Sequence, residues 1–459
     1  MEPWDVTIVG GGILGTSVAY WLAARYDGRF AVVEREPAVG EHASRRNTGV
    51  VHRPFYLHPA QAKVFARAAA ISYHLWKKYA AEKGLPWSEV GTYEVALDDS
   101  TTSVLDTYVQ WAERNGMQPS EVERLDGRSM REREPNIRCA GALFSKTDTA
   151  VDFRAFTDAL REDAERAGAR FLLGSTVVGV NETTEGLAVR LAPTPREPPV
   201  YLDPRGRVRV SRPAQETLHT RFLIGCAGGN AVDFAHMMGV GLEYTDLHFR
   251  GEYWVVSDAK KDLVRHNVYS VPRHRDLPFL DPHWIVRANG RREIGPNAVP
   301  VPGPEWYTGL LWPMTPWLRK LLEPPVRNKM HLALSKDFFV LSAQEMWSSI
   351  SKGEMVRRVQ KFLPALQAED LRARGTAGIR STVVNRHGAM MKEAIEVPGP
   401  HSYHILNYNS PGATGAPAFA AYLVDRLAAR GDLDHLQKNP KHQKVWDWDA
   451  IAGPMEFAG

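Results

Sequence analysis

Residues 4–34 read WDVTIVGGGILGTSVAYWLAARYDGRFAVVE, and this stretch sets the architecture of the chain. A short apolar run at 4–9 ends at three glycines and is typical of a buried parallel strand. A helical pattern at 16–25 follows, and Glu34 closes a second apolar run at 30–33. A strand, a glycine turn, a helix and a second strand in this order predict a dinucleotide-binding βαβ unit.

Gly10, Gly12 and Gly15 supply the Gly-x-Gly-x-x-Gly fingerprint. Gly10 makes the tight turn, Gly12 lets a pyrophosphate approach the backbone, and Gly15 lets the helix pack closely on the strand. The helix N-terminus then presents N–H groups and positive dipole to the phosphates. Glu34 follows at the spacing of a ribose-binding carboxylate. A purely structural glycine turn is disfavoured because all these elements occur together, but the fingerprint does not separate NAD from FAD.

The composition excludes several classes of protein. The 459 residues include 57 basic and 53 acidic side chains, and the net charge of +4 is too small for a nucleic-acid binder. The only two cysteines, Cys139 and Cys226, cannot supply a disulfide framework, a cysteine zinc site or an iron–sulfur cluster. No apolar run approaches the roughly 18 residues of a membrane span, and the N-terminus does not resemble a signal peptide. We therefore expect a cytoplasmic protein without a metal site.

The sequence after Glu34 favours a flavin over a nicotinamide. Residues 35–52 form a polar loop that is too long for a simple βαβ unit, and it lies where a flavin would continue from its pyrophosphate. No second Gly-x-Gly-x-x-Gly follows, so a separate NAD(P)H domain is not expected. Such a chain would take its electrons from a substrate.

Further motifs follow the fingerprint in a fixed order along most of the chain. They are SRRNTGVVH (44–52), GTYEVA (91–96), FLIGCAG (222–228), FRGEY (249–253), VP (271–272), LPFL (277–280), GPNAV (295–299), SISK (349–352), GIR (378–380) and NSPGAT (409–414). Together they resemble the FAD-dependent oxidoreductases of the D-amino-acid oxidase superfamily, and within it the L-2-hydroxyglutarate oxidase/dehydrogenase family. The chain departs from that pattern at RPFY (53–56) and at Gly412 and GAP (415–417), segments expected near the flavin, which leaves the exact substrate open.

The resemblance implies an α/β fold with two domains. One is a Rossmann-like FAD-binding domain that is discontinuous in sequence, and the other is an α+β substrate-binding domain on a mostly antiparallel sheet. We expect FAD-binding segments at 1–95, 151–240 and 373–459, and substrate-domain segments at 96–150 and 241–372. Periodicity agrees, with helices predicted at 59–83 and 151–167 and strands at 169–173, 176–180 and 218–227. Asn289-Gly290 between two strand-like runs predicts a hairpin with a type I′ turn.

The activity implied by the resemblance is FAD-dependent oxidation of a small 2-hydroxy acid. L-2-hydroxyglutarate would become 2-oxoglutarate by hydride transfer to flavin N5, and dioxygen or a quinone would re-oxidise the flavin. The residues expected to hold FAD on this basis are Gly10, Gly12, Ile13, Leu14, Gly15, Glu34, Arg35, Ser44, Asn47, Thr48, Gly49, Val177, Ala227, Gly228, Arg380, Pro411, Gly412, Ala413 and Thr414.

Five residues are candidates for the chemistry. His52 is the candidate base for the hydroxyl proton, although a structural hydrogen bond would explain it equally well. Arg380 and Arg250 are candidates for fixing substrate carboxylates, because a planar guanidinium matches carboxylate geometry. Tyr253 and Asn297 are candidates for orienting the substrate, although each residue type more often serves a core or a turn.

Other interpretations remain open at this stage. Residues 304–334 combine apolar and basic side chains, so the segment either covers the domain or makes peripheral contact with the inner face of a membrane, where a quinone would be met. The superfamily also includes amine and amino-acid oxidases. A flavin-bearing subunit that needs a redox partner is a further alternative.

Overall fold

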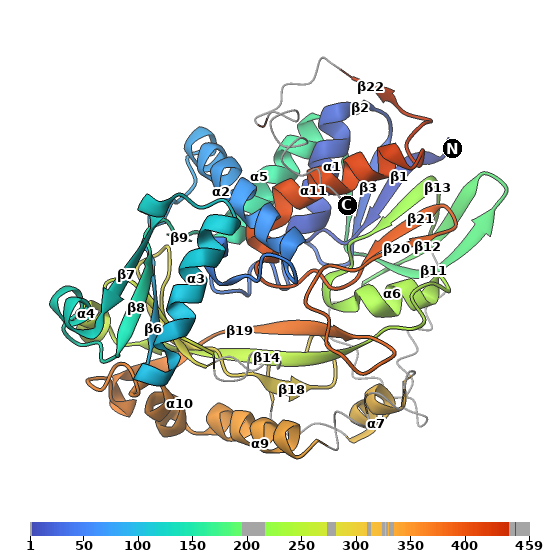
Figure 1. Ribbon diagram of the computed structural model, residues 1–459. Coiled ribbons are helices and arrows are strands. Elements are labelled where there is room, and N and C mark those ends of the chain that lie inside the picture. The colour runs from blue at the N-terminus through green and yellow to red at the C-terminus, as the bar shows by residue number, and fades with distance from the viewer. Residues whose placement is uncertain are drawn as a thin grey trace.

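The computed structural model describes residues 2–194, 216–272, 281–309, 314–323, 326, 329, 335–439 and 446. The described chain forms two large β-sheets with helices packed on both (Figure 1). Segments from the beginning, middle and end of the chain alternate between the two sheets. The motif stretch 277–280 lies outside the described residues, and so does most of 310–334.

The first sheet is the predicted dinucleotide-binding sheet. Its strands follow the order β10-β3-β1-β13-β12-β11, with β21 also paired to β13 and β20 to β21. The pairs β10–β3, β3–β1, β1–β13 and β13–β21 are parallel, as a doubly wound sheet requires. The strands are β1 (Trp4–Val9), β3 (Phe30–Glu34), β10 (Arg170–Leu173), β11 (Ser175–Thr183), β12 (Gly186–Pro193), β13 (Glu216–Gly225), β20 (Glu396–Gly399) and β21 (Ser402–Ile405).

Four helices build the core on one face of this sheet. They are α1 (Ile13–Arg25), α2 (Lys63–Lys83), α5 (Phe153–Arg166) and α11 (Gly412–Ala429). All residues of α1 except its last are buried, so this helix shows almost no amphipathic pattern. Trp21, Trp76 and Trp446 meet in the same apolar cluster, and Trp76 Nε1 donates to the carbonyl oxygen of Thr414 at 2.9 Å. The C-terminal helix is therefore held directly against the N-terminal half of the chain.

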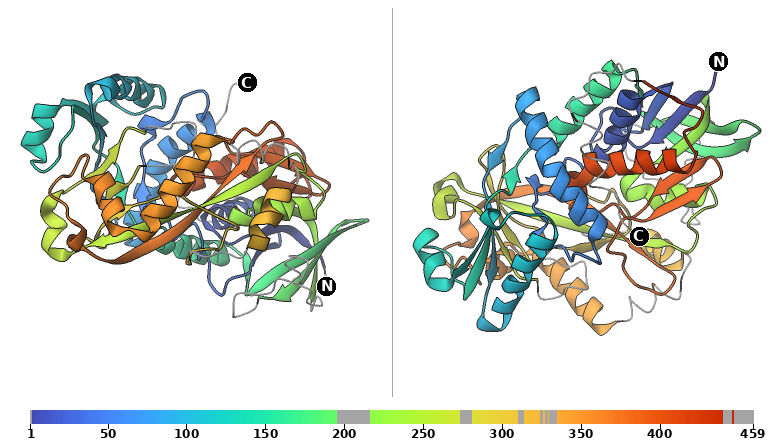
Figure 2. Two further views of the ribbon diagram at one scale, coloured as in Figure 1. Left: turned by 90° about the horizontal axis from the view of Figure 1, so that it is seen from below. Right: turned by 45° about the horizontal axis from the view of Figure 1, so that its top comes forward.

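The second sheet is mostly antiparallel, as expected. Its order is β18-β14-β17-β16-β15-β6-β8-β7, with β19 paired to β14, and only β15–β6 is parallel. Helices α9 and α10 lie on its side away from the first sheet (Figures 1 and 2). The strands are β6 (Thr92–Ala96), β7 (Val122–Asp126), β8 (Gly141–Ser145), β14 (Thr245–Val256), β15 (Asn267–Ser270), β16 (His283–Val286), β17 (Arg292–Gly295), β18 (Val299–Val301) and β19 (Leu371–Val384).

The remaining elements are short or peripheral. The helices are α3 (Thr102–Arg114), α4 (Gly127–Arg133), α6 (Ala231–Met237), α7 (Met314–Leu322), α9 (Lys336–Ile350) and α10 (Lys352–Val359). The 3₁₀ turns are η1 (Pro54–Tyr56), η2 (Asp99–Thr101), η3 (Pro119–Glu121), η4 (Gly228–Asn230), η5 (Asp258–Leu263) and η6 (Ala368–Asp370). Strands β2 (Tyr26–Asp27) and β22 (Gln437–Lys438) pair with each other, and β4 (Val50–Val51), β9 (Thr149–Ala150) and β5 (Ser88–Glu89) form a small sheet. Within the described chain no helix is both long and apolar enough to cross a bilayer.

The type I′ turn predicted at Asn289-Gly290 is wrong. Strands β16 and β17 do form the hairpin, and Gly290 has φ +81°, but Asn289 does not have the positive φ that a type I′ turn requires. Gly290 N–H instead donates to the carbonyl oxygen of Arg287 at 2.8 Å, and Arg287 N–H donates to that of Arg291 at 2.9 Å. The longer loop needs only one left-handed residue, which the glycine supplies.

Two strands bear on the predicted division of the chain. Strand β6 begins at Thr92, inside the segment 1–95, and β19 crosses the position 372/373, yet both belong to the second sheet. The chain thus enters the second sheet a few residues before the boundary expected at 95/96. It leaves that sheet several residues after the boundary expected at 372/373. The division into FAD-binding and substrate-binding segments stays a prediction.

Candidate active site

Glycine keeps the first turn of the fingerprint free of side chains. Gly10 has φ +111°, and a Cβ on it would lie 2.3 Å from the carbonyl oxygen of Cys226. A Cβ on Gly15 would lie 2.0 Å from the carbonyl oxygen of Gly10. Gly12 is the N-cap of α1, and Ile13 and Leu14 begin its first turn. Side chains are therefore excluded where the backbone of β1 meets the N-terminus of α1.

Glu34 lies beside this turn at the end of β3. Its Oε2 accepts a hydrogen bond from Gly11 N–H at 2.6 Å, and its Oε1 accepts one from Glu36 N–H at 2.8 Å. Burial raises the pKa of the carboxyl, and the two N–H donors oppose the rise. Arg35 points elsewhere, because it donates to His42 Nε2 at 2.9 Å and pairs with Glu305.

The loop 44–49 is fixed by contacts to both sheets. Ser44 Oγ accepts a hydrogen bond from Ile13 N–H at 2.9 Å, which joins the loop to α1. Asn47 Oδ1 accepts one from Gly49 N–H at 2.8 Å, and Gly49 has φ +71°. Arg287, at the end of β16, donates to the carbonyl oxygen of Asn47 at 2.6 Å. The loop therefore connects the glycine turn with the second sheet.

The other expected cofactor residues lie around the carboxyl ends of the parallel strands. Ala227 and Gly228 follow β13, and Gly228 has φ +56°. The start of β11, which contains Val177, is brought to the end of β3 by a hydrogen bond from Gly174 N–H to the carbonyl oxygen of Glu36 at 2.9 Å. Helix α11 begins in the same region, with Pro411 as its N-cap and Gly412, Ala413 and Thr414 in its first turn.

His52 and Asp148 face each other because of a short strand pair. Strands β4 and β9 are antiparallel, with Val51 opposite Thr149, so the next residues outward, His52 and Asp148, come together. His52 Nδ1 lies 3.2 Å from Asp148 Oδ2. Thr48 Oγ1 lies 3.5 Å from His52 Nε2 on the other side of the ring. The backbone N–H of His52 donates to Thr414 Oγ1 at 3.1 Å, which places the histidine beside the start of α11.

Three aromatic side chains surround His52. Tyr56 and Tyr269 meet its ring edge to face, with centroids 6.1 and 5.8 Å away, and His283 stacks on Tyr269 at 3.8 Å. Among the described residues, the Tyr269 hydroxyl and His283 Nδ1 are buried without a hydrogen-bond partner. Burial raises the pKa of Tyr269 and holds the pKa of His283 well below its usual range, so both groups are neutral near pH 7. Two buried polar atoms are therefore available to a ligand.

Arg380 completes the cluster from β19. Desolvation lowers its pKa, and the side chain is close enough to Tyr56, Tyr253 and His283 to interact electrostatically with each. Within the described part of the chain, the guanidinium has neither a hydrogen bond nor an ion pair. A guanidinium stays protonated at physiological pH, so an anionic ligand would satisfy this site.

A comparison with family models decides the class of the protein. The model described as "FAD dependent oxidoreductase" matches residues 5–426, which is most of the chain. The chain belongs to the FAD-dependent oxidoreductase family. It is therefore a flavoprotein oxidoreductase, as the sequence motifs predicted.

Full-length relatives agree with this assignment. The chain is 29% identical to the L-2-hydroxyglutarate dehydrogenase of Salmonella houtenae, and the match covers 95% of each protein. It is also 29% identical to the mitochondrial L-2-hydroxyglutarate dehydrogenase of Caenorhabditis elegans, over 94% of this chain and 95% of that one. Among solved structures, the L-α-glycerophosphate oxidase of Mycoplasma pneumoniae with FAD bound has the same fold, with a TM-score of 0.70 at 20% identity over 96% of this chain and 98% of that one.

The residues present fit FAD. The glycine turn excludes side chains where a pyrophosphate approaches the backbone, and the first turn of α1 carries no acidic residue that would repel phosphate. The Glu34 carboxylate lies beside the turn and can accept further hydrogen bonds. At the other end, the ring of Tyr408 lies 3.0 Å from a Cβ built on Gly412. The Tyr408 hydroxyl is buried and has no hydrogen-bond partner in the described chain. These features follow the path that the cofactor would take from α1 to α11.

The structure does not bring Arg250 and Asn297 into the cluster. Arg250 lies opposite Ile379 and Arg380 opposite Phe249, so the two arginines leave the strand pair on opposite faces. Arg250 pairs with Glu252 at 3.0 Å and donates to the carbonyl oxygens of Trp306 and Gly309. The amide of Asn297 makes hydrogen bonds to Glu252 N–H at 2.8 Å and to Glu252 Oε2 at 2.9 Å. Both side chains thus serve a buried network around Glu252.

Tyr253 lies at the edge of the cluster. The guanidinium of Arg287 covers its ring, with the central carbon 4.9 Å from the ring centroid. Burial raises the pKa of the Tyr253 hydroxyl to about 12, and Arg287 and Arg380 moderate the rise. Tyr253 therefore stays protonated near pH 7.

Four residues of the cluster were not among the sequence candidates: Tyr56, Asp148, Tyr269 and His283. Tyr56 lies in the segment 53–56, where the sequence differs from the family pattern and to which no role was assigned. Asp148 is 96 positions from its partner His52, and Tyr269 and His283 sit on adjacent strands of the second sheet. A pairing of the strand-like run 50–51 with 149–150 would have been the one signal for Asp148, but two-residue strands carry no periodicity.

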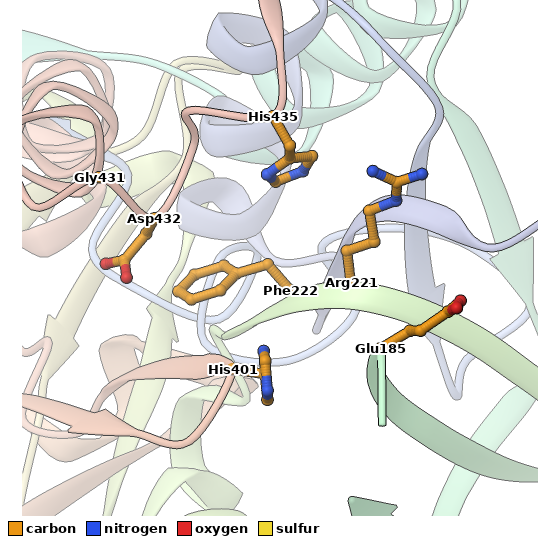
Figure 3. Close-up of a pocket in the computed structure, with 7 residues that line it drawn as sticks. All are labelled: Glu185, Arg221, Phe222, His401, Gly431, Asp432 and His435. Atoms are coloured by element: carbon orange, nitrogen blue, oxygen red, sulfur yellow. The ribbon is translucent and has the colours of Figure 1, made fainter. Parts of the chain in front are cut away.

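A separate surface pocket lies away from this site. Its volume is about 570 Å³, and it is lined by Glu185, Arg221, Phe222, His401, Gly431, Asp432 and His435 (Figure 3). His401 precedes β21, so this pocket borders the amino end of a parallel strand. Ligands of open α/β sheets bind at the carboxyl ends, where the glycine turn lies.

Proposed function

We propose that this flavoprotein oxidises a small 2-hydroxy acid to the 2-oxo acid, with L-2-hydroxyglutarate as the substrate and 2-oxoglutarate as the product. The observation that carries the proposal is Arg380, a cation without an anionic partner in the described chain, which lies near His283 and Tyr56, as His52 does. A substrate carboxylate would supply the missing charge. The relatives named L-2-hydroxyglutarate dehydrogenase support the choice of substrate.

In this proposal each residue of the cluster has one task. Arg380 binds a substrate carboxylate through two N–H donors, and the Tyr269 hydroxyl and His283 Nδ1 bond to substrate oxygens. His52 Nε2 accepts the proton of the substrate hydroxyl. FAD, when bound, would supply the acceptor for the hydride that leaves the carbinol carbon. The aromatic rings of Tyr56 and Tyr269 keep water away from the histidine.

The division of labour along the chain is part of the proposal. The segments 1–95, 151–240 and 373–459 hold FAD and contribute His52 and Arg380 to the substrate site, and the segments 96–150 and 241–372 supply the rest of that site. FAD is held by the glycine turn, by Glu34, by the loop 44–49 and by the first turn of α11. The alternation of the two sheets supports this division.

The test is to add substrate to the purified holoenzyme without oxygen and to follow the visible flavin absorbance. We expect L-2-hydroxyglutarate to bleach the flavin and to yield one equivalent of 2-oxoglutarate. D-2-hydroxyglutarate, L-lactate and L-glutamate serve as controls for configuration, for the second carboxylate and for the amino group. Bleaching by an amino acid alone would identify an amine or amino-acid oxidase instead. A flavin that no substrate bleaches, in a chain that co-purifies with a redox protein, would indicate a partner-dependent subunit.

We further propose that the electron acceptor is a quinone met at a membrane surface. Helices α7 and α9 lie on the side of the second sheet away from the first (Figure 1). Large apolar side chains on these helices are exposed: Leu318, Leu322, Phe339, Trp347 and Ile350 are 50 to 70% exposed. Exposed apolar residues gathered on one face are typical of interaction surfaces. Dioxygen is the alternative acceptor.

The expected role of basic residues in that contact is wrong for two of them. Lys320 is buried and pairs with Asp246 and with Glu323, and Lys329 is buried and lies 3.1 Å from Glu323. Both lysines therefore stabilise the interior of the segment instead of facing lipid. The side chains of Arg319 and Arg327 lie outside the described residues.

A further inference from the structure

The side chain of Asp148 is one of the most completely enclosed charged groups in the described chain. Its exposure is 0%, and it lies in the turn between β8 and β9, next to the strand pair that carries His52. A carboxylate at this depth is stable only where donors surround it. The identity of those donors shows what the carboxylate does.

Four donors converge on the two oxygens of Asp148. Oδ1 accepts from Arg53 N–H at 3.1 Å and from the Ser145 hydroxyl at 2.7 Å. Oδ2 accepts from the Thr92 hydroxyl at 2.9 Å and lies 3.2 Å from His52 Nδ1. Three of these contacts hold the carboxylate in place, from Arg53 at the start of η1, from β6 and from β8. The fourth is directed at the histidine.

The geometry fixes the direction of the hydrogen bond between the two residues. A carboxylate is an acceptor only, so His52 Nδ1 carries the proton of this hydrogen bond, and in the neutral imidazole Nε2 then keeps a lone pair. Nε2 faces the opposite side of the ring, where Thr48 Oγ1 lies at 3.5 Å. The other polar groups around the ring are Tyr56 from η1, Tyr269 from β15, His283 from β16 and Arg380 from β19, and none of them competes for Nδ1.

We propose that Asp148 is the positioning residue of the reaction, which holds His52 as the Nδ1–H tautomer with Nε2 directed to the substrate hydroxyl. The inference deepens the proposed function and rests on it. Asp148 does not touch the substrate. It acts through His52, and the negative charge of its carboxylate stabilises the imidazolium that forms when Nε2 accepts the proton.

The first experiment observes the tautomer directly. We suggest ¹⁵N-histidine labelling of the FAD-loaded protein, with the His52 signals assigned by their loss in His52→Asn. We expect a protonated, pyrrole-like Nδ1 and a lone-pair-bearing, pyridine-like Nε2. In Asp148→Asn the amide can donate to Nδ1, so the two signals should exchange character. A wild-type protein whose proton sits on Nε2 and not on Nδ1 would overturn the proposal, and this result needs no substrate.

The second experiment asks whether Asp148 acts through His52. We expect Asp148→Asn to slow flavin reduction at saturating substrate at least about 100-fold, the scale of a lost general base. In serine proteases the equivalent Asp→Asn change lowers kcat about 10⁴-fold by imposing the wrong tautomer. In the His52→Asn background the same Asp148→Asn change should have no further effect beyond about twofold. Losses that multiply would show a merely structural role for Asp148.

Ser145→Ala is the matched control. It removes a donor to Oδ1 and leaves the Oδ2 contact with His52 unchanged, so we expect the tautomer to be retained and the rate to fall less than about tenfold. FAD content of each variant, measured by absorbance, reports folding. If the wild type is not reduced by any 2-hydroxy acid, the proposed function fails, while the labelling experiment still decides the tautomer.

Discussion

Two arginines, Arg53 and Arg380, have different roles although both belong to segments that build the site. Arg53 follows His52 directly, yet its Nη2 donates to both carboxylate oxygens of Glu121, at 2.8 and 2.9 Å, and its guanidinium covers the ring of Tyr73 at 4.3 Å. It is therefore a structural residue that joins η1 to α2 and η3. Arg380 has no such partner in the described chain, which is why we assign the substrate carboxylate to it.

We expect Arg380→Met to lower kcat/KM for L-2-hydroxyglutarate at least about 100-fold, because a charge-assisted bidentate contact contributes about 3 kcal/mol. Arg380→Lys keeps the charge without the planar fork and should recover only part of the loss. Arg372→Met, on the same strand but with a 65% exposed side chain, is the control and should leave the rate unchanged. An Arg380 variant that binds FAD normally and keeps its full rate constant would sink the proposed mechanism.

His404 predicts how stability changes with pH. It is buried in β21, and desolvation lowers its pKa to about 4, whereas the unfolded chain takes up the proton near pH 6.5. The contribution of His404 to the free energy of unfolding is therefore greatest above about pH 6.5 and decreases as the pH falls to about 4. The total decrease from this group is roughly 3 kcal/mol. Denaturant titrations at several pH values give the free energy of unfolding as a function of pH. Between about pH 4 and 6.5 this free energy should change less steeply with pH in His404→Gln than in the wild type. Equal slopes would refute the assignment.

The residue scale also shows what the sequence could not reveal. Arg380 and His52 lie in motifs, and their types suggested their chemistry. Asp148 could not be found, because its role depends on a pairing between two-residue strands almost a hundred positions apart. Arg250 and Arg380 are equivalent as residue types, and only the β14–β19 register separates one face from the other.

At the scale of elements, long segments with a hydrophobic period were predictable from the sequence. Close contacts between two backbone segments were not. The helices expected at 59–83 and 151–167 are α2 (Lys63–Lys83) and α5 (Phe153–Arg166), because burial of one face imposes a readable period. The close contact of β19 with the loop 44–49 produces no periodic pattern in the sequence that would predict it. A Cβ on Gly378 would lie 2.0 Å from the carbonyl oxygen of Arg46.

We expect Gly378→Ala to displace the loop 44–49 and to weaken FAD binding, with the FAD content after gel filtration falling several-fold. Gly378 does not have a positive φ, so the effect would come from the steric conflict and not from backbone strain. Gly353→Ala in α10 is the control, because its Cβ would find its nearest neighbour at 3.8 Å. If both variants retain FAD equally, the contact between β19 and the loop does not support the cofactor.

At the scale of the whole molecule, the proposed membrane contact concerns one outer face, the one that carries α7 and α9. We expect the wild type to float with vesicles of phosphatidylethanolamine and phosphatidylglycerol. The double variant Phe339→Ser/Trp347→Ser should lose at least about 100-fold in partitioning, since each aromatic side chain that enters the membrane contributes about 1.5–3 kcal/mol. Met237→Ser, on α6, is the matched exposed control. Flotation that is unchanged in the double variant would remove α9 from the contact.

The order of strands in the first sheet also constrains how the protein is made. Strand β21 pairs with β13 in the centre of that sheet, and α11 packs on α1 and α2, although both elements come after residue 400. A chain emerging from the ribosome therefore exposes the apolar surfaces of α1, α2 and β13 until β21 and α11 have been synthesised and have packed on them. The start of α11 borders the proposed cofactor path, so the flavin can be enclosed only after this late helix has joined the first sheet.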